Sequence, residues 1–391
     1  MLIQSPHDPN FVQNPYPLYD RARQTGPVVF WQDYGMLAAF DHATAHALLR
    51  DKRLGRAVPD ARRQPVPDHL TAFHALERHS LLELEPPEHT RLRRLVLHAF
   101  TSRRIAGLEA DIRAICADLL ASLPAVEFDL IPAYCQQVPV RVIARLLGVP
   151  EAMGPDLLRW SAAMVAMYQA GRSRAIEEAA NTAAIEFADF LRRYIEQRRS
   201  DPGNDLITEL IAAQDGAQTL SPEEMIGTCV LLLNAGHEAT VHSLGNAVKC
   251  LIENTKTDAT GPDQIDNTVE ELLRFTPPLH MFTRYAYETF EIGGHTLNSG
   301  DEIALMLGAA GRDPAVFAEP CQFDPTRPKP AHLAFGGGLH FCVGAPLARL
   351  EMQIALPALF GHMQHLRITE PPLFADSYHF HKLDRLMVSQ S

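Results

Sequence analysis

The stretch from Phe335 to Glu351 constrains the fold of this 391-residue chain more than any other. It reads FGGGLHFCVGAPLARLE, so a glycine-rich turn delivers a single cysteine, Cys342, to the start of an apolar, helix-forming segment. Glycines permit positive φ angles and a close approach of the backbone to other atoms. Because the N–H groups and the dipole at a helix N-terminus favour negative charge, we expect Cys342 to be a thiolate.

A thiolate that is held rigidly by a turn is a nucleophile, a zinc ligand or an axial ligand of haem iron. A nucleophile needs a base and an oxyanion hole, and a zinc site needs several more ligands. The chain has no Cys-x-x-Cys pair, and one lone thiolate within a large apolar protein suits haem iron. The alternative is a buried cysteine that only packs at the start of a helix.

The pattern Phe-x-x-Gly-x-His-x-Cys-x-Gly, followed by Leu-Ala-Arg, resembles the haem-binding loop of the cytochrome P450 family, the haem-thiolate monooxygenases. The resemblance implies that the cofactor is haem b, iron protoporphyrin IX, with Cys342 as its proximal iron ligand. It places Phe335 and Gly344 beside the cofactor and His340 at a haem propionate. It also implies a mostly α fold with a small β region, in which residues 1–391 form one domain around a long central helix.

The composition bears on partners and compartment. A net charge of −12 at pH 7 argues against a nucleic-acid partner, which needs a basic face. There is no window of 18 apolar residues, and the first residues lack the features of a signal peptide, so we expect no membrane span. The six cysteines are scattered without a framework, as in a reducing cytoplasm. We therefore expect a soluble, cytoplasmic monomer.

A basic pair lies on an expected helix near residue 90. The segment from Glu85 to Arg94 begins with prolines and acidic residues, which favour the start of a helix. His89 and Arg93 are four residues apart, so they share one helical face and suit an anionic ligand. The alternative is a solvated basic face. The resemblance assigns His89, Arg93 and the more distant Arg284 to the haem propionates.

The longest expected helix runs from about residue 220 to residue 252. Ser221 is a suitable N-cap, Pro222 fits the first helical position and Glu224 closes a capping box. A helix of roughly 30 residues is about 45 Å long and would cross the molecule. Gly236 in its middle costs about 1 kcal/mol relative to alanine, which indicates a close approach by something flat.

Polar side chains interrupt the apolar run of this helix at Glu238 and Thr240. Buried polar groups are costly without partners, so we expect them to serve a wet site. The segment resembles the oxygen-activation segment of the family, where an acid–threonine pair is usual, but here Ala239 follows the acid. Thr240 is rotated by about 100° around the helix relative to Ala239. We expect Glu238 to deliver protons through a water held by the substrate, with Thr240 secondary.

The resemblance assigns the substrate pocket to residues near this helix and in two further segments. They are His237, then Leu279, His280, Met281 and Phe282, and a turn near the C-terminus with His379 and His381. The simple explanation for the four histidines is that nearby carbonyls satisfy several of them. The alternative is a substrate with a carboxylate or several oxygens, because an apolar ligand would leave polar groups unpaired.

Glu271 and Arg274 are three residues apart on another expected helix, and they can form an ion pair. Exposed pairs of this kind are worth less than about 1 kcal/mol. The resemblance instead assigns Glu271 and Arg274 to a buried structural network behind the haem.

The resemblance implies insertion of one oxygen atom from O2 into a C–H bond of a mid-sized, largely apolar organic substrate. Such a substrate could be a terpenoid or polyketide-type natural product with polar or carboxylate groups. Electrons must come from a separate ferredoxin with its reductase, because the chain has no flavin or nucleotide motif. A basic patch would steer this ferredoxin, and its members are Arg91, Arg94, Arg103, Arg104 and Arg349. A haem-thiolate peroxygenase or rearrangement enzyme, and a non-catalytic haem sensor, remain as alternatives.

Overall fold

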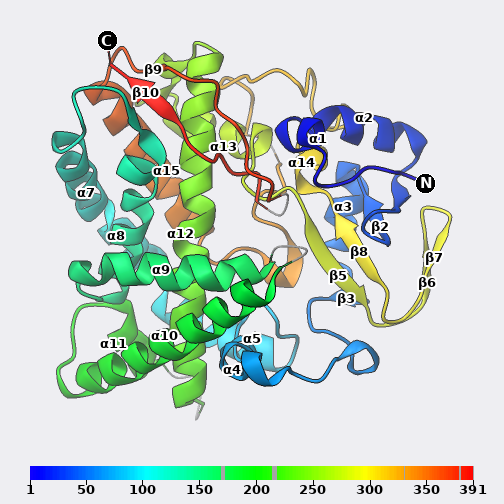
Figure 1. Ribbon diagram of the computed structural model, residues 1–391, viewed down its shortest axis with the longest axis horizontal. Coiled ribbons are helices and arrows are strands. Elements are labelled where there is room, and N and C mark those ends of the chain that lie inside the picture. Colours follow the sequence, from blue (N-terminus) through cyan, green and yellow to red (C-terminus); the bar gives the residue numbers. More distant parts are fainter. Residues whose placement is uncertain (169–171, 214–217, 330, 378–379, 391) are drawn as a thin grey trace.

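The computed structural model describes residues 1–391 apart from 169–171, 214–217, 330, 378–379 and 391. It confirms the mostly α fold with a small β region (Figure 1). No helix within these described ranges is both long and apolar enough to cross a membrane. The α-helices are α1 (Pro9–Gln13), α2 (Tyr16–Thr25), α3 (His42–Leu48), α4 (Thr71–Glu77), α5 (Glu88–Ala99), α6 (Ser102–Gly107), α7 (Glu109–Ala121), α8 (Gln137–Leu147), α9 (Gly154–Val165), α10 (Arg174–Ser200), α11 (Leu206–Ala212), α12 (Pro222–Glu253), α13 (Ile265–Phe275), α14 (Leu307–Ala310) and α15 (Ala345–His362). The strands are β1 (Val28–Trp31), β2 (Met36–Ala39), β3 (Leu54–Gly55), β4 (Phe128–Asp129), β5 (Phe282–Ala286), β6 (Phe290–Ile292), β7 (His295–Leu297), β8 (Glu302–Leu305), β9 (Arg367–Ile368) and β10 (Met387–Ser389).

Helix α12 is the long central helix that the sequence predicted, and it stands in the middle of the helical part in Figure 1. It has 32 residues and begins with a capping box. The hydroxyl of Ser221 accepts a hydrogen bond from the N–H of Glu224 (3.2 Å), and the Glu224 carboxylate accepts one from the N–H of Ser221 (2.9 Å). Along its length α12 packs against α8, α9, α10, α13 and α15.

The glycine in the middle of α12 packs against a neighbouring helix. A Cβ atom at Gly236 would lie 3.0 Å from Cδ1 of Ile143 in α8, closer than side chains normally approach. In the direction of the missing Cβ atom, the neighbour of Gly236 is thus the branched side chain of Ile143. The missing side chain allows α8 and α12 to lie close together.

A five-stranded sheet joins segments from both halves of the chain. Its strand order is β1-β2-β8-β5-β3, in which β2 and β8 are parallel and the other neighbours are antiparallel. In Figure 1 this sheet lies to one side of the helical part, close to α2, α3 and α14. A smaller sheet pairs β10 with β4 and β9, and β6 and β7 form a hairpin. Strand β5 follows α13 in the sequence and carries Arg284 into the larger sheet.

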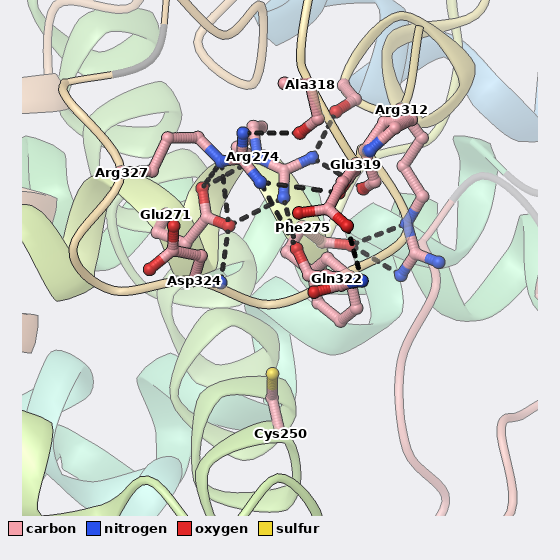
Figure 2. Close-up of polar contacts among 12 residues, drawn as sticks. Cys250, Glu271, Arg274, Phe275, Arg312, Ala318, Glu319, Gln322, Asp324 and Arg327 are labelled. Carbon is pink, nitrogen blue, oxygen red and sulfur yellow. Dashed lines mark hydrogen bonds and ion pairs between the residues drawn. The ribbon is translucent and has the colours of Figure 1, made fainter. Parts of the chain in front are cut away.

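A buried ion pair ties α13 to the segment that precedes the cysteine loop (Figure 2). Glu271 and Arg274 are both 0% exposed, and the guanidinium donates from Nε to Oε2 (2.7 Å) and from Nη2 to Oε1 (2.6 Å). Arg274 also donates to three carbonyl oxygens, those of Gly311, Pro320 and Gln322. The buried network implied for this pair is confirmed, because Nε, Nη1 and Nη2 of Arg274 all donate hydrogen bonds and the pair is shielded from water.

Candidate active site

The loop that carries Cys342 is fixed by its own backbone and by contact with the N-terminal part of the chain. The N–H of Cys342 donates to the carbonyl oxygen of Phe335 (3.1 Å). Gly338 has a φ of +65°, and a Cβ atom there would collide with the carbonyl oxygen of Leu49. A glycine is therefore needed at this position for the loop to close against residue 49.

Cys342 is exposed and stands just before the first turn of α15. Desolvation by the surrounding protein raises the pKa of its thiol. The N–H groups of Gly344 and Ala345 and the charges of Arg93 and Arg349 lower the pKa, but the net change is upward. The helix N-terminus thus lowers the pKa of Cys342, as expected, but it does not outweigh desolvation, and the thiolate stays a prediction. A metal ion that binds a thiol removes its proton outright, so iron ligation would supply the missing driving force.

His89 is a buried histidine on α5. Only 1% of this residue is exposed, and neither ring nitrogen has a hydrogen-bond partner among the described residues. Its ring lies beside that of His340, with 4.5 Å between the centroids. Desolvation, followed by the charges of His340 and Arg93, lowers the pKa of His89 to about 4. Buried polar atoms without partners are costly, so a ring like this one is suited to bind a further group.

Arg284 on β5 is a second buried cationic group. It is 3% exposed, and its Nη1 donates to the carbonyl oxygen of Thr283 (2.8 Å). Across the described part of the chain, no carboxylate forms an ion pair with it. Desolvation, followed by the charge of Arg56, lowers the pKa of Arg284 to about 10. A buried guanidinium without an anion is unfavourable, so this site is also suited to an anionic ligand.

The other two residues assigned to the propionates have protein partners. Nε2 of His340 lies 2.9 Å from Oε1 of Glu85. Nη2 of Arg93 donates to the carbonyl oxygen of Phe341 (2.6 Å). Sequence reasoning missed the contact of Glu85, because nothing in the local pattern shows that positions 85 and 340 meet.

Three of the expected residues lie on or against the cysteine loop. The ring of Phe335 lies under the guanidinium of Arg349, 4.6 Å from its carbon to the ring centroid. Phe282 lies against the loop, because a Cβ atom at Gly336 would be 3.0 Å from its ring. A Cβ atom at Gly344 would make an ordinary 3.8 Å contact with the cysteine sulfur, so space alone does not require glycine there.

The expected proton-delivery residues occupy one turn of α12. Oε1 of the partly buried Glu238 lies 3.1 Å from Nε2 of His242, one turn further along the helix. Ala239 offers no hydroxyl, and Thr240 is buried. Sequence reasoning missed His242, although its spacing of four residues from Glu238 on a predicted helix indicates the contact.

The structure places three expected pocket residues in the protein core. His280 is fully buried, and its Nδ1 lies 2.8 Å from the hydroxyl oxygen of Tyr19 in α2. Met281 belongs to the same N-terminal core cluster. His381 lies against His280, with 4.4 Å between the ring centroids. The segment just before β5 is thus in contact with α2 and with the C-terminal segment, and the assignment of these residues to the pocket stays a prediction.

The remaining pocket candidates are His237, Leu279 and His379. Nδ1 of His237 lies 2.8 Å from the carbonyl oxygen of Leu233, which fits the simple explanation that nearby carbonyls satisfy the histidines. Leu279 is partly buried and forms a β-bridge with Phe380. His379 lies outside the described residues. Among the three described histidines, His280 and His381 lie together, and His237 is bound within its own helix.

Comparison with known proteins identifies the family. A sequence model described as "Cytochrome P450" matches residues 264–377. The chain is 35% identical to the 6-deoxyerythronolide B hydroxylase of Saccharopolyspora erythraea, over 90% of this chain and 89% of the relative. It is 33% identical to the polyketide biosynthesis cytochrome P450 PksS of Bacillus subtilis, over 95% of this chain and 94% of the relative. The crystal structure of P450BioI in complex with hexadec-9Z-enoic acid ligated acyl carrier protein matches with a TM-score of 0.91 and 32% identity, over 97% of this chain and 99% of that one. The chain belongs to the cytochrome P450 family.

This cytochrome P450 is a monooxygenase, an oxidoreductase of a family that uses haem. Its residues fit that cofactor, because Cys342 is exposed and, among the described residues, the buried His89 and Arg284 have no anionic partner. Cys342 would hold the iron, and His89 and Arg284 would hold the propionates. When bound, haem supplies the reductive activation of O2.

Proposed function

We propose that this P450 inserts one oxygen atom from O2 into a C–H bond of a mid-sized, largely apolar natural product, with haem b as its cofactor. The observation that carries the proposal is the cysteine loop, in which Gly338 closes against Leu49 and holds Cys342 before α15. The substrate class we propose is a polyketide-type or terpenoid compound. It is supported by the names of two relatives, a hydroxylase of 6-deoxyerythronolide B and a P450 of polyketide biosynthesis.

The polypeptide would orient the substrate, exclude bulk water from the site and deliver protons. We propose that Glu238 passes protons through a water that the substrate holds, because Ala239 has no hydroxyl and Thr240 is buried one position further on. A positioned acid–base group typically contributes about 10²–10⁴-fold to a rate. Thr240 would have a secondary role.

We propose that a ferredoxin with its reductase donates the electrons. Of the five arginines expected to steer it, Arg94 and Arg103 are exposed. Arg91 pairs with Glu224, Arg104 with Glu209 and Arg349 with Glu270. We propose a docking patch that is centred on the exposed Arg103 and is smaller than the sequence indicated.

We also propose that residues 1–391 act as one domain in the cytoplasm. The five-stranded sheet and the packing around α12 both join segments that are distant in the sequence, which supports one domain. All six cysteines are free thiols, as expected in a reducing compartment.

Turnover by the purified protein tests the proposal. Macrolactones and other polyketide-type compounds would first be screened for a shift of the haem absorption spectrum. A compound that binds should then gain one labelled oxygen atom when labelled O2, a ferredoxin, its reductase and NADPH are supplied. Turnover with hydrogen peroxide but not with the reductase chain would favour the peroxygenase. The sensor would be favoured if no compound turned over while gas ligands changed the binding of another protein.

A further inference from the structure

Glu238 and His242 form a hydrogen-bonded pair on α12 that the proposed proton delivery does not by itself require. Oε1 of Glu238 lies 3.1 Å from Nε2 of His242, and their side chains are 16% and 8% exposed. Oε2 of Glu238 lies 3.8 Å from Nε2 of His237, which is beyond hydrogen-bond distance. Among the described residues, one carboxylate oxygen is therefore bound by the protein, and the other has no partner within hydrogen-bond distance, so it can accept a hydrogen bond from water.

The groups around this pair come from α12 and from the C-terminal segment. The ring of Phe380 meets that of His242 edge to face, with 5.5 Å between the centroids. Desolvation by itself would raise the pKa of Glu238. The hydrogen bond and charge of His242 and the charges of His237 and Lys382 outweigh it and lower the pKa of Glu238 to about 2. At neutral pH the carboxylate is thus ionised and acts as an acceptor.

We infer that His242 is a positioning residue, whose Nε2–H holds Oε1 of Glu238 so that Oε2 faces the water that relays protons. The inference rests on the proposed role of Glu238 in proton delivery. A glutamate side chain has several rotatable bonds, and ordering them during the reaction would cost entropy. A preformed hydrogen bond removes that cost, and it matters because a misplacement of about 1 Å can cost about 10²-fold in rate.

Substitutions of His242 that differ in the position of the side-chain nitrogen test this inference. The amide nitrogen of glutamine is the same number of bonds from Cα as Nε2 of histidine, whereas that of asparagine is one bond nearer. His242→Gln should therefore keep the product formed per electron pair within about twofold, while His242→Asn and His242→Ala should lower it by about tenfold. Adding His242→Ala to Glu238→Gln should cause no further loss, because the two residues act as one unit.

Another pair on the same helix provides the control. Nζ of Lys249 donates to Oε2 of Glu253 (2.6 Å), also four residues apart. Lys249→Ala should leave the product per electron pair unchanged. If Lys249→Ala lowered it as much as His242→Ala, the effect would be a general loss of helix stability and the inference would be overturned.

A spectroscopic measurement tests the contact without turnover. In the reduced, carbon-monoxide-bound protein with nitrogen-labelled histidine, the Nε2 resonance of His242 should shift in Glu238→Gln and stay unchanged in Glu253→Gln. An unshifted resonance, or a His242→Gln variant as impaired as His242→Ala, would overturn the inference. If Glu238→Gln were impaired while His242→Ala behaved like the wild type, the inference about His242 would be overturned and the proposed role of Glu238 would stand. A normal Glu238→Gln would instead remove the proposed role of Glu238, and the inference with it.

Discussion

Nη2 of Arg93 donates a 2.6 Å hydrogen bond to the carbonyl oxygen of Phe341, the residue before Cys342. This bond joins α5 directly to the cysteine loop. His89 lies one turn earlier on the same helix, with both ring nitrogens unpaired among the described residues. Helix α5 therefore supports the loop with one side chain and presents an unsatisfied ring with the other.

Arg93→Ala should loosen the cysteine loop. The lost charge-assisted hydrogen bond should lower the free energy of unfolding by about 1 kcal/mol, since the guanidinium is only partly buried. Haem should also pass faster from the variant to a haem-scavenging protein. Arg113→Ala, which removes an exposed ion pair with Glu109, is the control. Equal haem transfer from wild type and Arg93→Ala would contradict this use of the bond.

Cys342→His should change the ligand of the haem iron. The reduced carbon-monoxide complex of the wild type should show the red-shifted absorption of thiolate ligation, because the thiolate pushes electron density onto the iron. The variant should lose that absorption. An unchanged spectrum would exclude Cys342 as the ligand.

Ala239→Thr should give little gain in the product formed per electron pair with the native substrate. In our proposal the substrate already holds the relay water, so a hydroxyl on α12 has little left to add. Glu238→Gln should cause a large loss and Thr240→Ala a modest one. A large gain in Ala239→Thr would show that the substrate supplies no part of the relay.

Arg103→Glu should slow electron transfer from an acidic ferredoxin, because it reverses a charge in the proposed docking patch. The wild-type rate should fall as salt rises, and the variant should depend less on salt. Stopped-flow reduction at several ionic strengths measures both effects. Arg192→Glu changes an exposed arginine that pairs with Asp189 on α10, and it should have no such effect.

Glu351→Gln should stabilise the protein at alkaline pH. Glu351 lies on α15 and is 0% exposed, and neither carboxylate oxygen has a partner among the residues that the structure describes. Desolvation raises the pKa of Glu351 well above its usual range. The folded-state pKa exceeds the unfolded one, so the stability present below about pH 4 is lost as the pH rises toward the folded pKa.

The variant removes that loss. Its free energy of unfolding should exceed that of the wild type by about 1–3 kcal/mol near pH 8, and the two should be similar near pH 4. Glu253→Gln, which changes a half-exposed carboxylate on α12, should show no such gain. A stability profile of Glu351→Gln parallel to the wild type would contradict the prediction.

The start of α12 could be predicted because its signals are local. Ser221 and Glu224 bond to each other's backbone within one turn, so the sequence already contains both partners. The same holds for Glu238 and His242, which are four residues apart on a helix that the sequence predicts. A contact of this kind can be read from spacing.

The position of His280 could not be predicted in this way. Its partner Tyr19 is 261 residues away, and only the folded chain shows that α2 covers the segment before β5. The contact of Glu85 with His340 is equally non-local. The direction of the pKa shift of Cys342 could not be predicted for a related reason, since desolvation depends on the surrounding protein and outweighs the local helix N-terminus.

The strand order of the larger sheet has a consequence for how the protein is made. Strands β1, β2 and β3 end by Gly55, whereas their partners β5 and β8 lie between Phe282 and Leu305. During synthesis β2 and β3 cannot pair with β8 and β5 until most of the chain has left the ribosome. Unpaired edges attract strands of other chains, so nascent molecules should depend on chaperones until β8 emerges.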